Sequence, residues 1–127
     1  MQYHAVLESL TRIAVRVGPE YKYERTVGED FNGCKYIATV NGKTVHCIIG
    51  KMLLELCGSV PDINAECNSN SITTPAMLGW LNKAGIRFTL NALELANVVQ
   101  MDQDTKRTWY HAVLSGIDTV RYNPKED

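Results

Sequence analysis

Residues 34–49 read CKYIATVNGKTVHCII, and this segment contains the clearest structural signal in the chain. Two runs rich in β-branched and aromatic residues flank Asn41-Gly42, the dipeptide preferred in two-residue type I′ turns. We therefore predict an antiparallel β-hairpin over about 34–49. The turn fixes the register, so that Val40 lies opposite Lys43 and Ala38 opposite Val45, and continued pairing places Tyr36 opposite Cys47. The face that we expect to be buried contains Cys34, Tyr36, Ala38, Val40, Val45, Cys47 and Ile49.

Apolar residues on both sides of this hairpin recur at helical spacing. Val6, Leu10 and Ile13, for example, fall on one stripe of a helix. Thr74 followed by proline, Asn91 followed by Glu94 three positions later, and Thr105 resemble N-caps. The helices predicted from these signals cover residues 3–17, 51–57, 75–84, 91–104 and a last segment after Thr105.

The fold class that follows is α+β, a helix-dominated single domain over residues 1–122 with one hairpin and four or five helices. A chain of 127 residues has the usual size of one domain. Alternating residues over 21–27 leave a third strand open. Residues 59–73 form a polar loop with room for one helical turn, and residues 123–127 are expected to be a frayed tail.

Composition argues against two classes of partner. The formal net charge is −1, so the chain lacks the basic excess typical of nucleic-acid binding. No apolar run approaches the roughly 18 residues of a membrane span. The first 20 residues are amphipathic and do not resemble a signal peptide. These features predict a cytoplasmic protein that binds neither nucleic acid nor membrane.

Four cysteines, Cys34, Cys47, Cys57 and Cys67, are too widely spaced for a Cys-x-x-Cys pair or a zinc finger. We expect free, mostly buried thiols in a reducing compartment. His46 precedes Cys47, but adjacent residues on a strand point to opposite faces, which argues against a paired nucleophile and base.

Three acidic residues near the C-terminus, Asp102, Asp104 and Asp118, are candidates for acid–base or metal-binding groups. Asp102 and Asp104 face different ways on a helix. No histidine or third carboxylate is spaced to join them, and no phosphate-binding glycine motif occurs. The sequence thus predicts no catalytic residue, no metal ligand and no cofactor site.

Three motifs resemble small uncharacterised proteins of actinobacteria and their phages: Tyr36, then Cys47-Ile48-Ile49-Gly50-x-x-Leu53, then Gln100-x-x-Gln103-Asp104 with Trp109. The resemblance implies a cytoplasmic setting in a bacterial or phage-infected host cell, and it implies no activity. Gln103, Asp104 and Trp109 also have a structural interpretation, because they fall at a corner between two helices where amide groups need partners.

These observations favour a small non-enzymatic accessory protein that binds a host or phage protein. The alternative is a small-ligand protein, for example for a nucleotide second messenger, with Tyr21, Tyr23 and Arg25 as the binding surface. A cysteine-dependent enzyme is a third hypothesis. A homo-oligomer is compatible with each of them.

Overall fold

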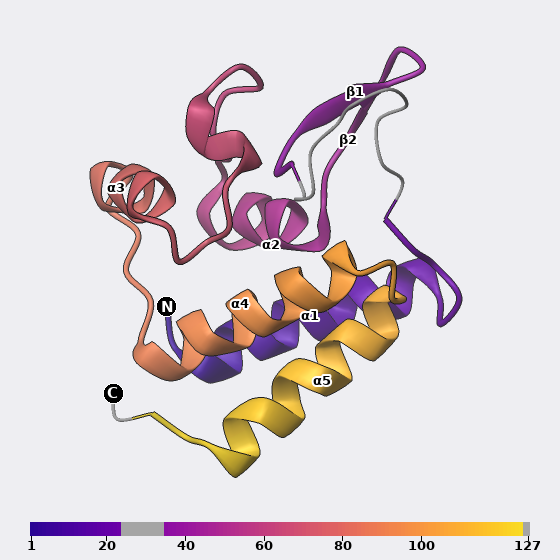
Figure 1. Ribbon diagram of the computed structural model, residues 1–127, viewed down its shortest axis with the longest axis vertical. Helices are drawn as coiled ribbons and strands as arrows, with labels where there is room; N and C mark the ends of the chain where they lie inside the picture. The colour runs from indigo at the N-terminus through magenta and orange to yellow at the C-terminus, as the bar shows by residue number, and fades with distance from the viewer. Residues whose placement is uncertain (24–34, 126–127) are drawn as a thin grey trace.

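The computed structural model describes residues 1–23 and 35–125, and Figure 1 shows their arrangement. It confirms the predicted fold class, a helix-dominated α+β domain. Within the described ranges the elements are α1 (Tyr3–Val17), β1 (Ala38–Val40), β2 (Lys43–Val45), α2 (Ile48–Cys57), the 3₁₀ helix η1 (Glu66–Ser69), α3 (Pro75–Lys83), α4 (Leu90–Asp104) and α5 (Trp109–Tyr122).

The hairpin turn and register are as predicted. Ala38 pairs with Val45 and Val40 with Lys43. Both turn residues have positive φ, 52° at Asn41 and 79° at Gly42, as a type I′ turn requires. Tyr36, Ala38, Cys47 and Ile49 of the predicted inner face are buried, and Val45 is half-buried, whereas Cys34 lies outside the described residues.

The strands are shorter than predicted, because the chain turns into α2 at Ile48. Each strand has three residues, and Cys47 is already the N-cap of the helix. The predicted pairing of Tyr36 with Cys47 is therefore wrong: the amide of Cys47 donates to the carbonyl of Lys35 at 3.2 Å instead. The prediction that α2 begins at residue 51 is also wrong, by one helical turn.

Gly50 lies inside α2 and meets the backbone just before β1. A Cβ atom built on Gly50 would stand 2.2 Å from the carbonyl oxygen of Tyr36. Glycine is thus required by the close approach of two backbones, not by a turn.

Residues 21–23, the described part of the possible third strand over 21–27, do not add a strand to the hairpin. Lys22 forms a single antiparallel bridge with Thr108, and the amide of Trp109 donates to the carbonyl of Tyr21 at 3.0 Å. This segment therefore pairs with the start of α5 and not with the hairpin. Residues 24–27 lie outside the described residues.

The helix ends follow local capping, with two corrections. Thr74 caps α3 as predicted. Thr89 caps α4 in place of Asn91, and Thr108 caps α5 in place of Thr105, because their hydroxyls accept the amides of Ala92 and His111. The side chain of Asn91 instead bonds both the amide and the carbonyl of Lys125, in the tail that we expected to fray.

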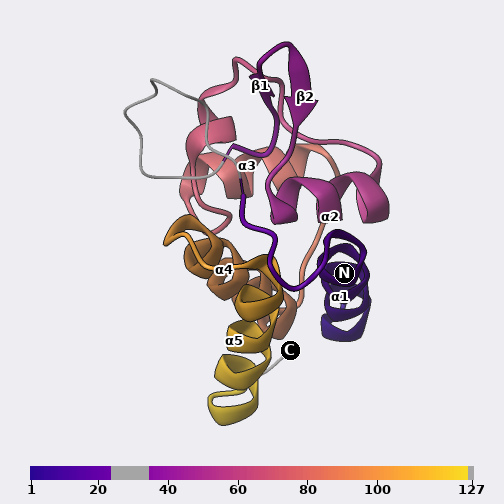
Figure 2. The same cartoon turned by 90° about the vertical axis from the view of Figure 1, so that its right-hand side faces the viewer.

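The helices form two layers (Figures 1 and 2). One contains α1 beside the antiparallel pair of α4 and α5, and the other contains α2, α3 and the hairpin. Gly116 lets α5 approach α4 closely, since a Cβ there would stand 2.7 Å from Leu95 and 2.8 Å from Val99. No helix in the described ranges is long and apolar enough to cross a membrane.

Candidate functional site

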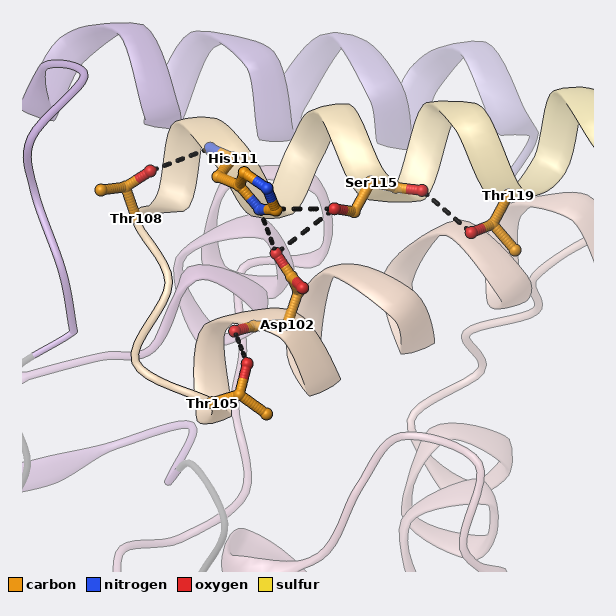
Figure 3. Close-up of polar contacts among 6 residues, drawn as sticks. All are labelled: Asp102, Thr105, Thr108, His111, Ser115 and Thr119. Atoms are coloured by element: carbon orange, nitrogen blue, oxygen red, sulfur yellow. Dashed lines mark hydrogen bonds and ion pairs between the residues drawn. The ribbon is translucent and has the colours of Figure 1, made fainter.

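The α4–α5 corner contains a polar cluster on its outer surface. Asp102 comes from the last turn of α4, and His111 and Ser115 stand one turn apart on α5. The Nδ1 atom of His111 lies 2.7 Å from Oδ2 of Asp102. Ser115 Oγ lies 3.4 Å from that carboxylate oxygen and 3.4 Å from that ring nitrogen (Figure 3). The three atoms thus form a compact triangle that joins the two helices.

Threonines hold the backbone around this cluster (Figure 3). Thr105 donates its hydroxyl to the carbonyl of Asp102 at 2.8 Å and so closes the end of α4. Thr108 accepts the amide of His111 at 3.0 Å and opens α5. Both helix ends are thus fixed by local caps, and the connection of residues 105–108 keeps the end of α4 close to the start of α5.

The cluster is accessible to solvent. The side chain of His111 is 48% exposed and that of Asp102 is 20% exposed. A hollow of about 230 Å³ lies along the adjacent stripe at the end of α4 and is lined by Val98, Met101, Asp102 and Thr105, but by neither His111 nor Ser115.

The geometry does not match a serine hydrolase triad. In that triad the carboxylate and the serine bind opposite ring nitrogens, so that the histidine can take the serine proton. Here Asp102 and Ser115 both lie at Nδ1 of His111. The three side chains hydrogen-bond to one another, and Ser115 is not placed as a nucleophile.

The sequence-based conclusion that no histidine joins the acidic residues is wrong. His111 lies nine positions from Asp102 and on another helix, so that no spacing within one helix could find it. The available signal was the short connection between two helices, which makes them antiparallel neighbours and brings both ends together. Asp104 points elsewhere and accepts a hydrogen bond from Nε2 of Gln103, and Asp118 is exposed on α5.

Gln103 and Trp109 lie in the interior behind this surface. The Oε1 atom of Gln103 accepts the amide of Ile48 at 2.9 Å and the indole Nε1–H of Trp109 at 3.1 Å. Gln103 therefore joins the starts of α2 and α5 to the end of α4. Together with Asp104, these side chains have the structural role that a helix corner needs.

The tyrosines of the alternative ligand surface contact the protein itself. The ring of Tyr21 packs edge-on against Trp109, with centroids 4.5 Å apart. The hydroxyl of Tyr23 donates to the carbonyl of Lys35 at 3.3 Å. Arg25 lies outside the described residues.

No disulfide joins Cys47, Cys57 and Cys67 to one another; Cys47 and Cys67 are buried, and Cys57 is half-buried. Burial raises the pKa of the Cys57 thiol, and burial likewise raises that of Cys67. Cys47 is fully buried, and its sulfur accepts the amide of Gly50 at 3.3 Å. Within residues 1–23 and 35–125, no three His, Cys, Asp or Glu side chains gather in a metal-binding group.

Comparison with known proteins finds no relative. No family model matches the chain, and neither a curated protein nor a solved structure is significantly similar to it.

Proposed function

We propose that this protein is a non-enzymatic accessory protein that acts by binding another protein. The observation behind the proposal is an exposed apolar pair on α5, formed by Tyr110 and Leu114. The two side chains stand one helical turn apart, and each residue is 47% exposed. The neighbouring side of the helix, about 100° around the axis, contains Trp109 and Val113 and is buried.

A helix with one apolar side against its own core and a second apolar pair toward solvent suits a protein interface. Single exposed apolar residues are ordinary, but tyrosine beside leucine at a spacing of four resembles the anchors of helix-in-groove recognition. We propose that the exposed pair inserts into an apolar groove of the partner.

The hollows on the described surface favour a protein over a small metabolite. A groove of about 450 Å³ is lined only by residues of α1, from Glu8 to Arg16. Another, of about 270 Å³, lies between α3 and the start of α4. Metabolite sites usually enclose most of their ligand, which the outer side of a single helix does not do.

The setting of this interaction is part of the proposal. The resemblance to small proteins of actinobacteria and their phages suggests the cytoplasm of a bacterial or phage-infected cell, with a host or phage protein as the partner. An actinobacterial lysate is therefore the right source of candidates.

The test compares capture by three forms of the tagged full chain. Leu114→Asp places a charge in the exposed pair. Val15→Asp is the matched control, because Val15 is 65% exposed on α1. We expect one stoichiometric protein to bind the wild type and Val15→Asp, and at least tenfold less of it to bind Leu114→Asp.

Two results would contradict the proposal. Equal capture by all three forms would mean that the exposed pair is not the interface. No captured protein, together with a rise in melting temperature on adding a nucleotide, would replace protein binding with the small-ligand hypothesis.

A further inference from the structure

We infer that the hollow between α3 and the start of α4 binds the C-terminus of a partner protein whose last residue has a large apolar side chain. That side chain fills the hollow, and the terminal carboxylate pairs with Arg87. The inference concerns a different surface from the exposed pair on α5 and does not depend on it. It rests on the lining of the hollow, on its volume and on its charge.

The hollow has a mostly apolar lining, contributed by two helices and the connection between them. Its lining residues are Leu78, Leu81, Asn82, Ile86, Arg87, Phe88 and Leu93. Leu81 is buried and forms the base, whereas Leu78 is 40% exposed. Apolar residues that stay partly exposed around a hollow gain free energy when another apolar group removes them from water.

The wall formed by the connection from α3 to α4 is held by backbone hydrogen bonds (Figure 1). The amide of Ile86 donates to the carbonyl of Leu81 at 2.9 Å and closes the end of α3. Further on, the amide of Thr89 donates to the carbonyl of Met1 at 2.9 Å, and the Thr89 side chain caps α4. The wall is thus ordered before a ligand binds, which reduces the entropic cost of binding.

The volume suits one side chain better than a whole metabolite. The hollow measures about 270 Å³. Typical small-molecule sites measure roughly 300–1,000 Å³. An apolar cavity of about 150 Å³ accepts benzene, so a leucine or phenylalanine side chain has enough room here. Anchors that fill such pockets supply much of the binding energy of protein interfaces.

The hollow has one charged lining residue, and this residue is a cation. Arg87 is exposed, and within residues 1–23 and 35–125 no carboxylate forms an ion pair with it. Lys83, in the last turn of α3, adds a second positive charge next to Asn82 in the chain. Since a guanidinium forms paired hydrogen bonds with a carboxylate, the charge favours an anionic group on the ligand.

A chain terminus combines the two features that the hollow requires. In a C-terminal residue the side chain and the carboxylate share one Cα atom, so both can reach a hollow and a cation at its edge. The carboxylate of an internal Asp or Glu belongs to a neighbouring Cα about 3.8 Å away. Capture of a terminal carboxylate is also a recurring mode of peptide recognition.

The test is a titration of the isotope-labelled full chain, followed by NMR of the backbone amides. N-acetyl-leucine represents the chain end, and we expect it to bind with a Kd on the order of 1 mM. It should shift the amides of Leu78, Phe88 and Leu93. N-acetyl-leucinamide, which lacks the carboxylate, should bind at least tenfold more weakly. Isocaproate, which is leucine without its amino group, should also bind more weakly than N-acetyl-leucine.

Variants of Arg87 test the role of its charge. Arg87→Gln should bind N-acetyl-leucine and its amide about equally, and Arg87→Lys should restore part of the preference for the acid. Lys83→Gln removes an exposed cation that does not line the hollow, so it is the matched control and should behave like the wild type. The amide spectrum of each variant also reports whether the variant is folded.

Other results would overturn the inference. They are the absence of shifts around the hollow at millimolar probe, equal binding of the acid and the amide by the wild type, and an unchanged preference for the acid in Arg87→Gln. Tighter binding of isocaproate than of N-acetyl-leucine would assign the hollow to a free acid. Shifts confined to the surroundings of Tyr110 and Leu114 would place the ligand on α5 instead.

Discussion

At the scale of single residues, two helical glycines differ in whether the surrounding structure leaves room for a side chain. Gly50 in α2 stands against the carbonyl of Tyr36, whereas no atom lies within 4 Å of a Cβ built on Gly79 in α3. Neither residue has a positive φ, so backbone conformation does not separate them. The difference between them is steric, and it can be measured with the same substitution at both positions.

We predict that Gly50→Ala destabilises the protein and that Gly79→Ala does not. The methyl group at residue 50 would have to push α2 away from the backbone of residue 36, and such overpacking costs about 1–3 kcal/mol or more. At residue 79 alanine has the higher helix propensity, worth up to about 1 kcal/mol. Urea unfolding of both variants gives the free energies, and equal stability of the two would contradict the close approach.

At the scale of elements, the contact between α1 and α2 includes an ionic cluster around Glu55. One carboxylate oxygen accepts from Arg12 Nε at 2.8 Å and Nη2 at 2.6 Å, and the other accepts from Ser9 Oγ at 2.9 Å. The Arg12 guanidinium, followed by the Ser9 hydroxyl, holds the pKa of Glu55 below its usual range despite some desolvation. Since these side chains are partly exposed, the stabilisation is modest.

This pKa shift predicts how stability depends on pH. A carboxyl group whose pKa is lower in the folded state stabilises the fold fully above its unfolded pKa, near 4.5. The stabilisation is lost as the pH falls through the lower, folded value. We therefore expect the melting temperature of the wild type to fall more steeply than that of Glu55→Gln between neutral pH and about pH 3. Parallel curves for the two proteins would contradict this role of Glu55.

Local signals explain which elements the sequence predicts well. The bounds of α1 and the register around Asn41-Gly42 depend on neighbouring residues, and both are correct. The predicted start of α2 is three residues late because β-branched Ile48 and Ile49 favour a strand in the sequence pattern. In the structure both residues are helical and buried in the core. A helix N-terminus at Cys47 has no strong local signal, since cysteine is an unusual cap.

The candidate site depended on contacts that local patterns do not contain. The approach of His111 to Asp102 requires the correct phase of two helices, and this phase is set by interior packing at Gly116. The partner of Tyr21 is likewise distant in sequence, since its ring packs edge-on against Trp109. Contacts between such distant residues depend on the tertiary fold and cannot be predicted from local sequence patterns.

At the scale of the whole molecule, a buried polar network connects the two layers. Gln100 donates to the hydroxyl of Tyr36 at 3.0 Å and accepts the amide of Ile72 at 2.8 Å. One turn further on, Gln103 bonds Ile48 and Trp109. Both glutamines are almost fully buried on α4. Satisfied networks of this kind favour one packing of the layers, because each displaced partner would be left unbonded in a low dielectric.

We predict that Gln103→Leu destabilises the protein by about 2–4 kcal/mol, although leucine fits a buried position. The substitution leaves two buried donors, the amide of Ile48 and the indole of Trp109, without their acceptor, and each such loss costs about 1–3 kcal/mol. Gln2→Leu is the matched control, because Gln2 is exposed and makes no capping bond; its effect should stay within about 0.5 kcal/mol. Denaturant unfolding followed by tryptophan fluorescence measures both variants. If Gln103→Leu were as stable as the control, the glutamine would not hold the layers together, and apolar packing around α4 alone would fix their arrangement.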